Sequence, residues 1–193
     1  AQVYTDLGLF TCDEEMGADA TDLFNYLTGY SAKKDYRKFL VAPINLRSSI
    51  EALIRREIEF AQRGEPAQLI FKINALVDKA MMRLLYQASQ AGVKIDLIVR
   101  GMCCLRPGLP GVSENIRVTS IVGRFLEHSR IYYFRNGDNE QIYLGSADLM
   151  PRNLDRRVEA LCPLQNPTVH QQVLEQIMVA NLKDNEQSWQ LLP

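Results

Sequence analysis

The first half of the chain alternates between two hydrophobic periods, one typical of helices and one typical of buried strands. Two segments place apolar residues at the three- and four-residue spacing of an amphipathic helix, and each ends at a glycine, Gly64 or Gly92. Short runs rich in branched residues lie between them. The predicted order is a strand over 39–42, a helix over 43–64, a strand over 67–73, a helix over 78–92 and a strand over 93–99. This order predicts a parallel sheet with helices on its faces.

The second half has a different rhythm, because its apolar runs follow one another too closely for helices to lie between them. Residues 106–111, RPGLPG, form a loop, and strands are expected over 116–122, 130–134, 141–144 and 158–162. Asn136 and Gly137 are typical of a hairpin turn. We therefore predict an α/β fold, a phospholipase-D-like sandwich with a mixed, largely parallel central sheet flanked by helices.

Both ends of the chain also have helical patterns. Asp19 or Thr21 is expected to cap a short helix that stops at Gly29, and Pro167 is expected to begin a closing helix. With 193 residues, of which 47% are hydrophobic, the chain is long enough for one domain over 1–193. We expect the acidic residues 1–18 to be a connection from a preceding domain.

The bulk composition narrows the class of protein. No apolar run is long enough to span a membrane, and the start lacks the regions of a signal peptide, so we expect a cytoplasmic protein and leave open peripheral membrane association of a larger parent. The four cysteines form no CxxC pair. Reduced thiols are therefore expected, and a zinc site is not.

Charge is distributed unevenly, although the formal net charge is only -1. Residues 1–22 carry six acidic side chains and no lysine or arginine, whereas residues 94–135 are rich in arginine. Clustered arginine favours a phosphorylated or polyanionic ligand, while scattered solvated charges remain the alternative. No Gly-rich phosphate loop of the GxxxxGK[ST] type is present.

The strongest candidate for chemistry is the stretch over 123–148. In an extended chain His128 and Arg130 share a face, and the returning strand brings Ser146 and Asp148 alongside them. An imidazole can attack phosphorus or transfer a proton, a guanidinium can bind anionic oxygens, and a carboxylate can orient the ring. The other histidine, His170, is expected to have a surface role.

Further candidates lie at the ends of predicted strands. Arg100 follows the strand over 93–99, where ligands bind in open α/β sheets, and Lys72 could add a cation to the same rim. Arg157 and Glu159 are two residues apart on a predicted strand, so Glu159 could hold the guanidinium in place. Ordinary surface pairing remains the alternative for each of these side chains.

Several of these residues lie in segments that resemble two known protein families. HSR at 128–130 and GSAD at 145–148 resemble the His-x-Lys and Gly-Ser-x-Asn halves of the phospholipase D motif, with arginine for lysine and aspartate for asparagine. Longer segments are similar to the carboxy-terminal domain of bacterial polyphosphate kinases: VYTDLGLFT at 3–11, DLFNYLTGY at 22–30, IVRGMCCLRPGLPGVSENIRVTSIVGRFLEHSRIYYF at 98–134 and LGSADLMPRNLDRRVEAL at 144–161.

The second resemblance implies an enzyme that reversibly moves the γ-phosphate of ATP onto inorganic polyphosphate, with Mg²⁺ and a phosphohistidine. The resemblance implies that Arg100 binds nucleotide phosphates, that His128 is a second essential histidine, and that Arg157 and Glu159 support the site. We expect His128, Arg130 and Arg157 to bind ATP or phosphate as well. The phosphorylated histidine and the magnesium-associated residues belong to the preceding domain. The expected partners are therefore ATP or ADP, polyphosphate, the preceding domains and further copies of the parent, with no nucleic acid. The chain alone would be half of an active site and inactive.

Two other functions remain open from the sequence. One is a phospholipase-D-like phosphodiesterase, in which two identical chains would pair their His128 side chains. The other is a non-catalytic module that binds polyanions or mediates oligomerisation.

Overall fold

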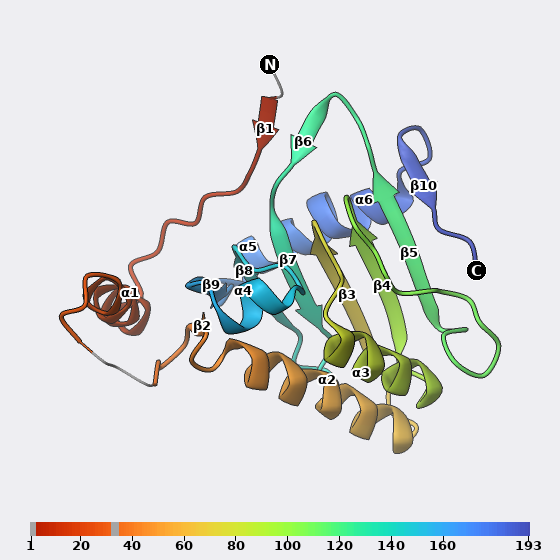
Figure 1. The fold of residues 1–193 in the computed structure, drawn as a ribbon, viewed down its shortest axis with the longest axis horizontal. Coiled ribbons are helices and arrows are strands. Elements are labelled where there is room, and N and C mark those ends of the chain that lie inside the picture. The colour runs from red at the N-terminus through yellow and green to blue at the C-terminus, as the bar shows by residue number, and fades with distance from the viewer. Residues whose placement is uncertain (1–2, 32–34) are drawn as a thin grey trace.

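A mixed eight-stranded sheet is the centre of the fold in the computed structural model, which describes residues 3–31 and 35–193 (Figure 1). The strands, in order across the sheet, are β10 (Ser188–Gln190), β5 (Ile116–Ile121), β4 (Lys94–Val99), β3 (Gln68–Ile73), β7 (Arg130–Phe134), β8 (Gln141–Gly145), β9 (Glu159–Pro163) and β2 (Leu40–Ala42). The central strands β3 and β4 are almost wholly buried, which explains their continuous runs of branched residues.

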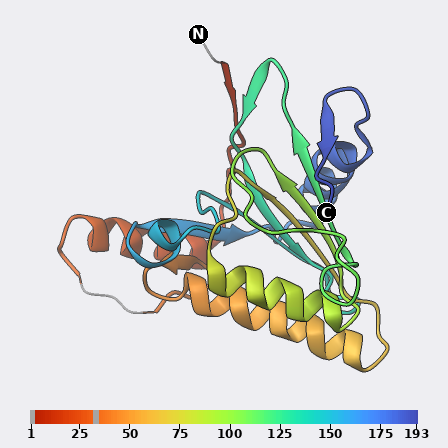
Figure 2. The same cartoon turned by 45° about the vertical axis from the view of Figure 1, so that its right-hand side comes forward.

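Helices cover both faces of this sheet. Helices α2 (Leu46–Gln62) and α3 (Lys79–Gln90) lie together on one face, as Figures 1 and 2 show, and the larger apolar cluster fills the space beneath them. The opposite face carries α5 (Pro167–Gln172), the π-helical segment η1 (Val173–Val179) and α6 (Ala180–Lys183), over a smaller cluster. A short helix, α4 (Pro151–Asp155), follows β8. The predicted α/β arrangement, with helices flanking a mixed sheet, is confirmed.

The prediction that parallel pairing dominates the sheet is wrong. In the part of the chain that the structure describes, β3–β4 and β4–β5 are the parallel pairs of this sheet, and its other five pairs are antiparallel. The unit β3–α3–β4 is the expected parallel crossover, but β2 lies at the far edge, antiparallel to β9. Hydrophobic periodicity identifies strands but does not show which strands pair with one another. The position of β2 just before α2 in the sequence therefore did not reveal that it pairs with β9.

Local signals explain where most elements end. Asp78 caps α3 by accepting a hydrogen bond from the backbone N–H of Met81, and Gly64 and Gly92 adopt φ values of 75° and 96° just beyond α2 and α3. The first helix, α1 (Glu14–Leu27), begins earlier than predicted. Asp13 is its cap, because its side chain accepts from the backbone N–H of Met16. Neither Asp19 nor Thr21 is the cap.

Asp19 instead joins α1 to the segment that precedes β2. Its carboxylate is buried and accepts hydrogen bonds from the backbone N–H groups of Arg37, Lys38 and Phe39, at 3.0, 2.7 and 3.0 Å. Arg37 adds a side-chain hydrogen bond of 3.1 Å. Burial alone would raise the pKa of Asp19, but these hydrogen bonds leave that pKa below its ordinary value.

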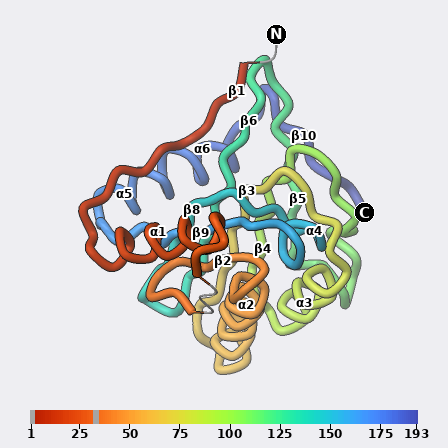
Figure 3. The backbone as a smooth tube through the Cα atoms, turned by 60° about the vertical axis from the view of Figure 1, so that its left-hand side comes forward, coloured from red at the N-terminus to blue at the C-terminus, as the bar shows by residue number. Residues whose placement is uncertain are grey.

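A separate two-stranded ribbon joins the N-terminal segment to the middle of the chain. Strand β1 (Val3–Thr5) pairs in parallel with β6 (Phe125–Glu127), and the chain then runs past the closing helix to α1 (Figure 3). Leu7 and Leu9 pack against the smaller cluster, together with Val169 and Ile177. This ribbon was not predicted from the sequence. It brings Asp6 close to His128.

The remaining predictions for the second half are confirmed. Strands β5, β7, β8 and β9 lie where they were expected, and Asn136 and Gly137 turn the β7–β8 hairpin with φ values of 50° and 65°. The closing helix begins at Pro167. No helix in residues 3–31 or 35–193 combines the length and apolar character needed to cross a membrane.

Candidate functional site

The site begins where the parallel strands β3 and β4 end side by side. Asn74 follows β3 and Arg100 follows β4, and the Arg100 backbone N–H donates to the carbonyl oxygen of Ile73 at 3.2 Å. The N–H of Gly101 donates to the carbonyl oxygen of Asn74 at 2.9 Å, and a Cβ at Gly101 would lie 2.7 Å from that oxygen. A larger residue at position 101 would therefore separate the two strand ends.

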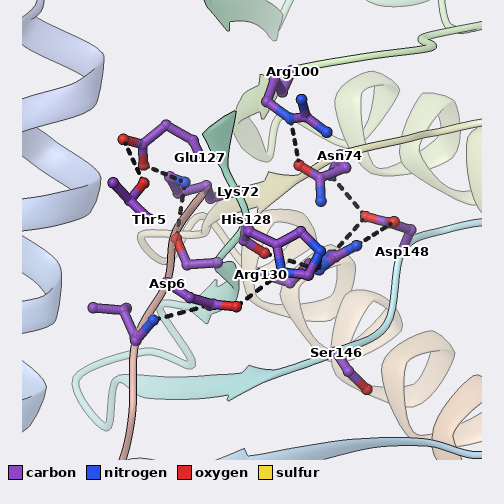
Figure 4. Close-up of polar contacts among 12 residues, drawn as sticks. Thr5, Asp6, Lys72, Asn74, Arg100, Glu127, His128, Arg130, Ser146 and Asp148 are labelled. Atoms are coloured by element: carbon purple, nitrogen blue, oxygen red, sulfur yellow. Dashed lines mark hydrogen bonds and ion pairs between the residues drawn. The ribbon is translucent and has the colours of Figure 1, made fainter. Parts of the chain in front are cut away.

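The side chains at these ends also bind one another. The Nε of Arg100 donates to Oδ1 of Asn74 at 2.9 Å. The backbone N–H of Asn74 donates to Oδ1 of Asp148 at 2.7 Å, and that of Ala75 reaches the same oxygen at 3.3 Å. Asn74 thus joins Arg100 to a carboxylate that belongs to the β8 end of the sheet (Figure 4).

Asp148 holds Arg130 through two parallel contacts. Nε of Arg130 donates to Oδ1 at 3.3 Å, and Nη2 donates to Oδ2 at 3.1 Å. Their side chains are 13% and 8% exposed, so the pair is largely removed from water. This two-point geometry suits the planar guanidinium and explains aspartate at a position where the phospholipase D motif has asparagine beside a lysine.

His128 completes the cluster beside Arg130. Nη1 of Arg130 lies 3.2 Å from Nδ1 and 3.1 Å from Nε2 of the ring, and it donates to the His128 carbonyl oxygen at 2.9 Å. The predicted proximity of His128, Arg130 and Asp148 is therefore found. The imidazole is 38% exposed and can meet a ligand.

Asp6, which sequence reasoning missed, orients the His128 ring. Its Oδ2 lies 2.8 Å from Nδ1 of His128, and Tyr4 packs edge-to-face against the imidazole with centroids 5.6 Å apart. Because a carboxylate only accepts hydrogen bonds, this contact requires a proton on Nδ1 of His128. Partial burial would raise the pKa of Asp6, but the hydrogen bond to His128 leaves it lowered.

Lys72 lies in a different setting from the rim position that was expected. Its side chain is buried, and Nζ donates to Oγ of Ser129 at 2.9 Å and to Oε2 of Glu127 at 3.2 Å. Glu127 and Ser129 flank His128 in the sequence. Burial lowers the pKa of Lys72, and the charge of Glu127 opposes that shift. The ammonium is thus occupied in joining β3 to the segment that carries His128.

Arg157 and Glu159 do not form the pair that was expected. Glu159 accepts hydrogen bonds from Oγ of Ser146 and Nδ2 of Asn153, both at 2.5 Å, whereas Arg157 is exposed. Strand β9 begins only at Glu159, and the backbone N–H of Arg157, in the turn after α4, donates to the carbonyl oxygen of Arg152 at 2.8 Å. The two side chains therefore do not alternate along one strand. Figure 4 shows Ser146 apart from the cluster around Arg130.

The charges of the cluster suit the binding of an anion at Arg100. Asp148 forms an ion pair with Arg130, and Asp6 is bound to His128, but Arg100 has no ion pair with any residue in the described ranges. Its terminal nitrogens are therefore available as hydrogen-bond donors. No group of three or more histidine, cysteine, aspartate or glutamate side chains within residues 3–31 and 35–193 could hold a metal ion.

Asn74 and Asp6, which bind Arg100 and His128, were not predicted as site residues from the sequence. Asn74 follows a predicted buried strand, so the rule that singled out Arg100 would also have found it. Asp6 carries no such signal, because only the β1–β6 ribbon brings it to His128.

Comparison with known proteins identifies related sequences over the whole chain. Residues 39–193 match the family described as "Polyphosphate kinase C-terminal domain 2", and residues 1–33 match "Polyphosphate kinase C-terminal domain 1". Polyphosphate kinases from Thermosynechococcus vestitus and Synechocystis sp. are each 58% identical to all 193 residues. The match covers 26% of each of those proteins, so the chain spans about a quarter of their length.

Solved structures agree with the sequence comparison. The crystal structure of polyphosphate kinase from Porphyromonas gingivalis is 43% identical, with a TM-score of 0.90 over 93% of this chain and 28% of that one. A phospholipase D family member, Nuc from Salmonella typhimurium, is 12% identical, with a TM-score of 0.56 over 81% of this chain and 97% of that one. The second likeness concerns the fold alone and confirms the phospholipase-D-like architecture. The site roles predicted from the sequence, and the single domain with a connection over 1–18, stay predictions.

Proposed function

Because this chain belongs to the polyphosphate kinase family, we propose that it supplies half of a site that reversibly transfers the γ-phosphate of ATP to inorganic polyphosphate. In this proposal the preceding domain supplies the histidine that becomes phosphorylated. The observation that carries the proposal is the convergence of an imidazole and two guanidinium groups, joined by Asn74 and Asp148, at the ends of β3, β4 and β8. The parent would bind ATP or ADP and polyphosphate and would assemble as a homo-oligomer.

Each side chain has a role that follows from its contacts. Arg100, with its terminal nitrogens available, binds the nucleotide phosphates. His128, whose ring is held between Asp6 and Arg130, assists the transferring group by proton transfer or by stabilising its charge. Arg130, fixed by Asp148, keeps the imidazole in place and adds positive charge. Arg157 supports the site from the turn after α4, and Glu159 supports it from the first residue of β9.

In this proposal, magnesium is held by groups outside this chain. The described residues offer no ligand group for it, and Asp6 and Asp148 are engaged with His128 and Arg130. We therefore propose that nucleotide phosphates and residues of the preceding domains hold Mg²⁺, where it neutralises phosphate charge. Binding and orientation by this chain do not depend on a metal ligand of its own.

The test uses a hybrid kinase, in which this chain replaces the matching quarter of the Thermosynechococcus vestitus enzyme. With ATP, magnesium and a polyphosphate primer, the hybrid should form an acid-labile phosphoenzyme and lengthen the polymer. The 193-residue chain alone should do neither. We expect His128→Ala to lower the rate of synthesis by at least about a hundredfold, within the range of acid–base and electrostatic contributions.

His170→Ala is the matched control, because His170 lies on α5, away from the cluster, and its loss should leave synthesis unchanged. Near-normal synthesis by the folded His128→Ala hybrid would refute the role of this histidine. Cleavage of bis(p-nitrophenyl) phosphate by the chain alone would instead support a phosphodiesterase. Polyphosphate binding by a hybrid without phosphotransferase activity would support a non-catalytic module.

A further inference from the structure

The side-chain amide of Asn74 carries a hydrogen-bond donor without an acceptor. Oδ1 accepts from Nε of Arg100 at 2.9 Å, and because a guanidinium only donates, this contact fixes which end of the amide is oxygen. Nδ2 therefore lies on the other side. It is buried and has no hydrogen-bond partner within residues 3–31 and 35–193, and Asn74 as a whole is only 8% exposed.

Such a donor is unusual, because buried polar groups in native proteins nearly always have a partner. The nearby carboxylate of Asp148 does not serve Nδ2. Its Oδ1 accepts from the backbone N–H groups of Asn74 and Ala75 and from Nε of Arg130, and its Oδ2 accepts from Nη2 of Arg130. In Figure 4 the nitrogen end of the Asn74 amide points away from the Arg100 Nε, toward the side on which His128 and Arg130 lie.

We propose that Asn74 is an anion-binding residue, whose Nδ2 donates to an oxygen of the phosphoryl group that Arg100 binds. This inference rests on the proposed function, since it assigns a further ligand to the same substrate. An anionic oxygen is the acceptor that suits the position, because Arg100 and Arg130 lie on either side of the amide and neither can accept a hydrogen bond.

The surroundings of Asn74 make it a fixed ligand. Its backbone N–H is bound by Asp148, its carbonyl oxygen by the N–H of Gly101, and its amide oxygen by Arg100. A donor held at three points fixes the position of a phosphoryl oxygen and adds no charge. A flexible arginine side chain fixes that position less precisely. Nδ2 is shielded from water, so the anion reaches it from the side on which the partly exposed Arg100 and His128 lie.

The decisive test separates direct donation from support of Arg100. Tripolyphosphate is titrated calorimetrically into the 193-residue chain, into Asn74→Ala, into Arg100→Ala and into the double variant. If Asn74 acts only by holding Arg100, its removal has no effect once Arg100 is gone. If Nδ2 binds the anion, Asn74→Ala should weaken binding about tenfold, or 1.4 kcal/mol, in both backgrounds.

Asn115→Ala is the matched control, because its amide nitrogen already donates to the carbonyl oxygen of Ser89 at 2.9 Å. Should Asn74→Ala fail to fold by circular dichroism, Asn74→Asp keeps an acceptor for Arg100 and removes the donor, so it should also weaken binding at least tenfold. Unchanged affinity in the Arg100→Ala background, or in folded Asn74→Asp, would overturn the inference.

The hybrid kinase separates this inference from the proposed function. An active hybrid in which Asn74→Ala leaves the KM values for ATP and polyphosphate unchanged would refute the inference alone. An inactive hybrid whose isolated chain still binds tripolyphosphate through Asn74 would refute the proposed function and retain the anion site.

Discussion

Replacing Asp148 by asparagine tests whether one carboxylate unites the site. Oδ1 of Asp148 accepts from the backbone N–H groups of Asn74 and Ala75 and from Nε of Arg130, while Oδ2 accepts from Nη2 of Arg130. In Asp148→Asn the amide oxygen can keep the first three contacts. The amide nitrogen then faces Nη2, so one hydrogen bond becomes a clash of donors and the guanidinium loses its counter-charge.

The magnitude follows from the burial of the pair. A hydrogen bond to a charged group contributes about 1.5–3 kcal/mol, and breaking a buried ion pair costs about 3–5 kcal/mol. Because the side chains of Arg130 and Asp148 are 13% and 8% exposed, we expect Asp148→Asn to lower the free energy of unfolding by about 3 kcal/mol. Arg130→Lys should lower it by less, because a lysine keeps the charge and loses the two-point geometry.

Urea denaturation at pH 7, followed by far-ultraviolet circular dichroism, measures both single variants and the double variant. The double variant has the lysine and asparagine of the phospholipase D motif. We therefore expect it to be less destabilised than the sum of the single changes by at least about 1 kcal/mol. Additivity within about 0.5 kcal/mol, or no measurable loss in Asp148→Asn, would show that the two side chains do not act as a unit.

Three other changes test the fold and the orientation of the imidazole. Asp19→Asn should make the free energy of unfolding depend less on pH in the acid range. The folded pKa of Asp19 is lowered, so the carboxylate stabilises the fold above the usual value of 3.8, and this contribution is lost as the pH falls through the folded pKa. An unchanged acid-unfolding profile would contradict this. Gly145→Ala should lower the free energy of unfolding by about 3 kcal/mol or more, because the added Cβ would overlap the carbonyl oxygen of Ala160. Thermal or urea unfolding measures this, and a change below about 0.5 kcal/mol would refute the close approach. Asp6→Asn should lower kcat of the hybrid kinase about ten- to hundredfold with a smaller change in KM, because the tautomer of His128 is no longer fixed. ¹⁵N NMR of the ring should then show a mixture of tautomers. A single unchanged tautomer would argue against the role of Asp6 in orienting His128.

Local sequence predicted the elements well, because their signals are local. Branched runs produced β3 and β4, helical spacing produced α2 and α3, and positive-φ glycines ended those helices. The proximity of His128, Arg130 and Asp148 was also accessible, since a hairpin with a defined turn fixes which residues face one another. The pairing of Glu159 was not accessible, because it depends on where β9 begins.

What the sequence by itself determined is the set of strands and helices, the hairpin of the histidine segment and the family to which the chain belongs. Only the tertiary structure decided the strand order, the parallel ribbon that carries Asp6 to His128, and the side-by-side ends of β3 and β4 that join Asn74 to Arg100. Periodicity reports which face of an element is buried and says nothing about its neighbours. Contacts such as Asp6 with His128, separated by 122 positions, depend on packing of the whole chain.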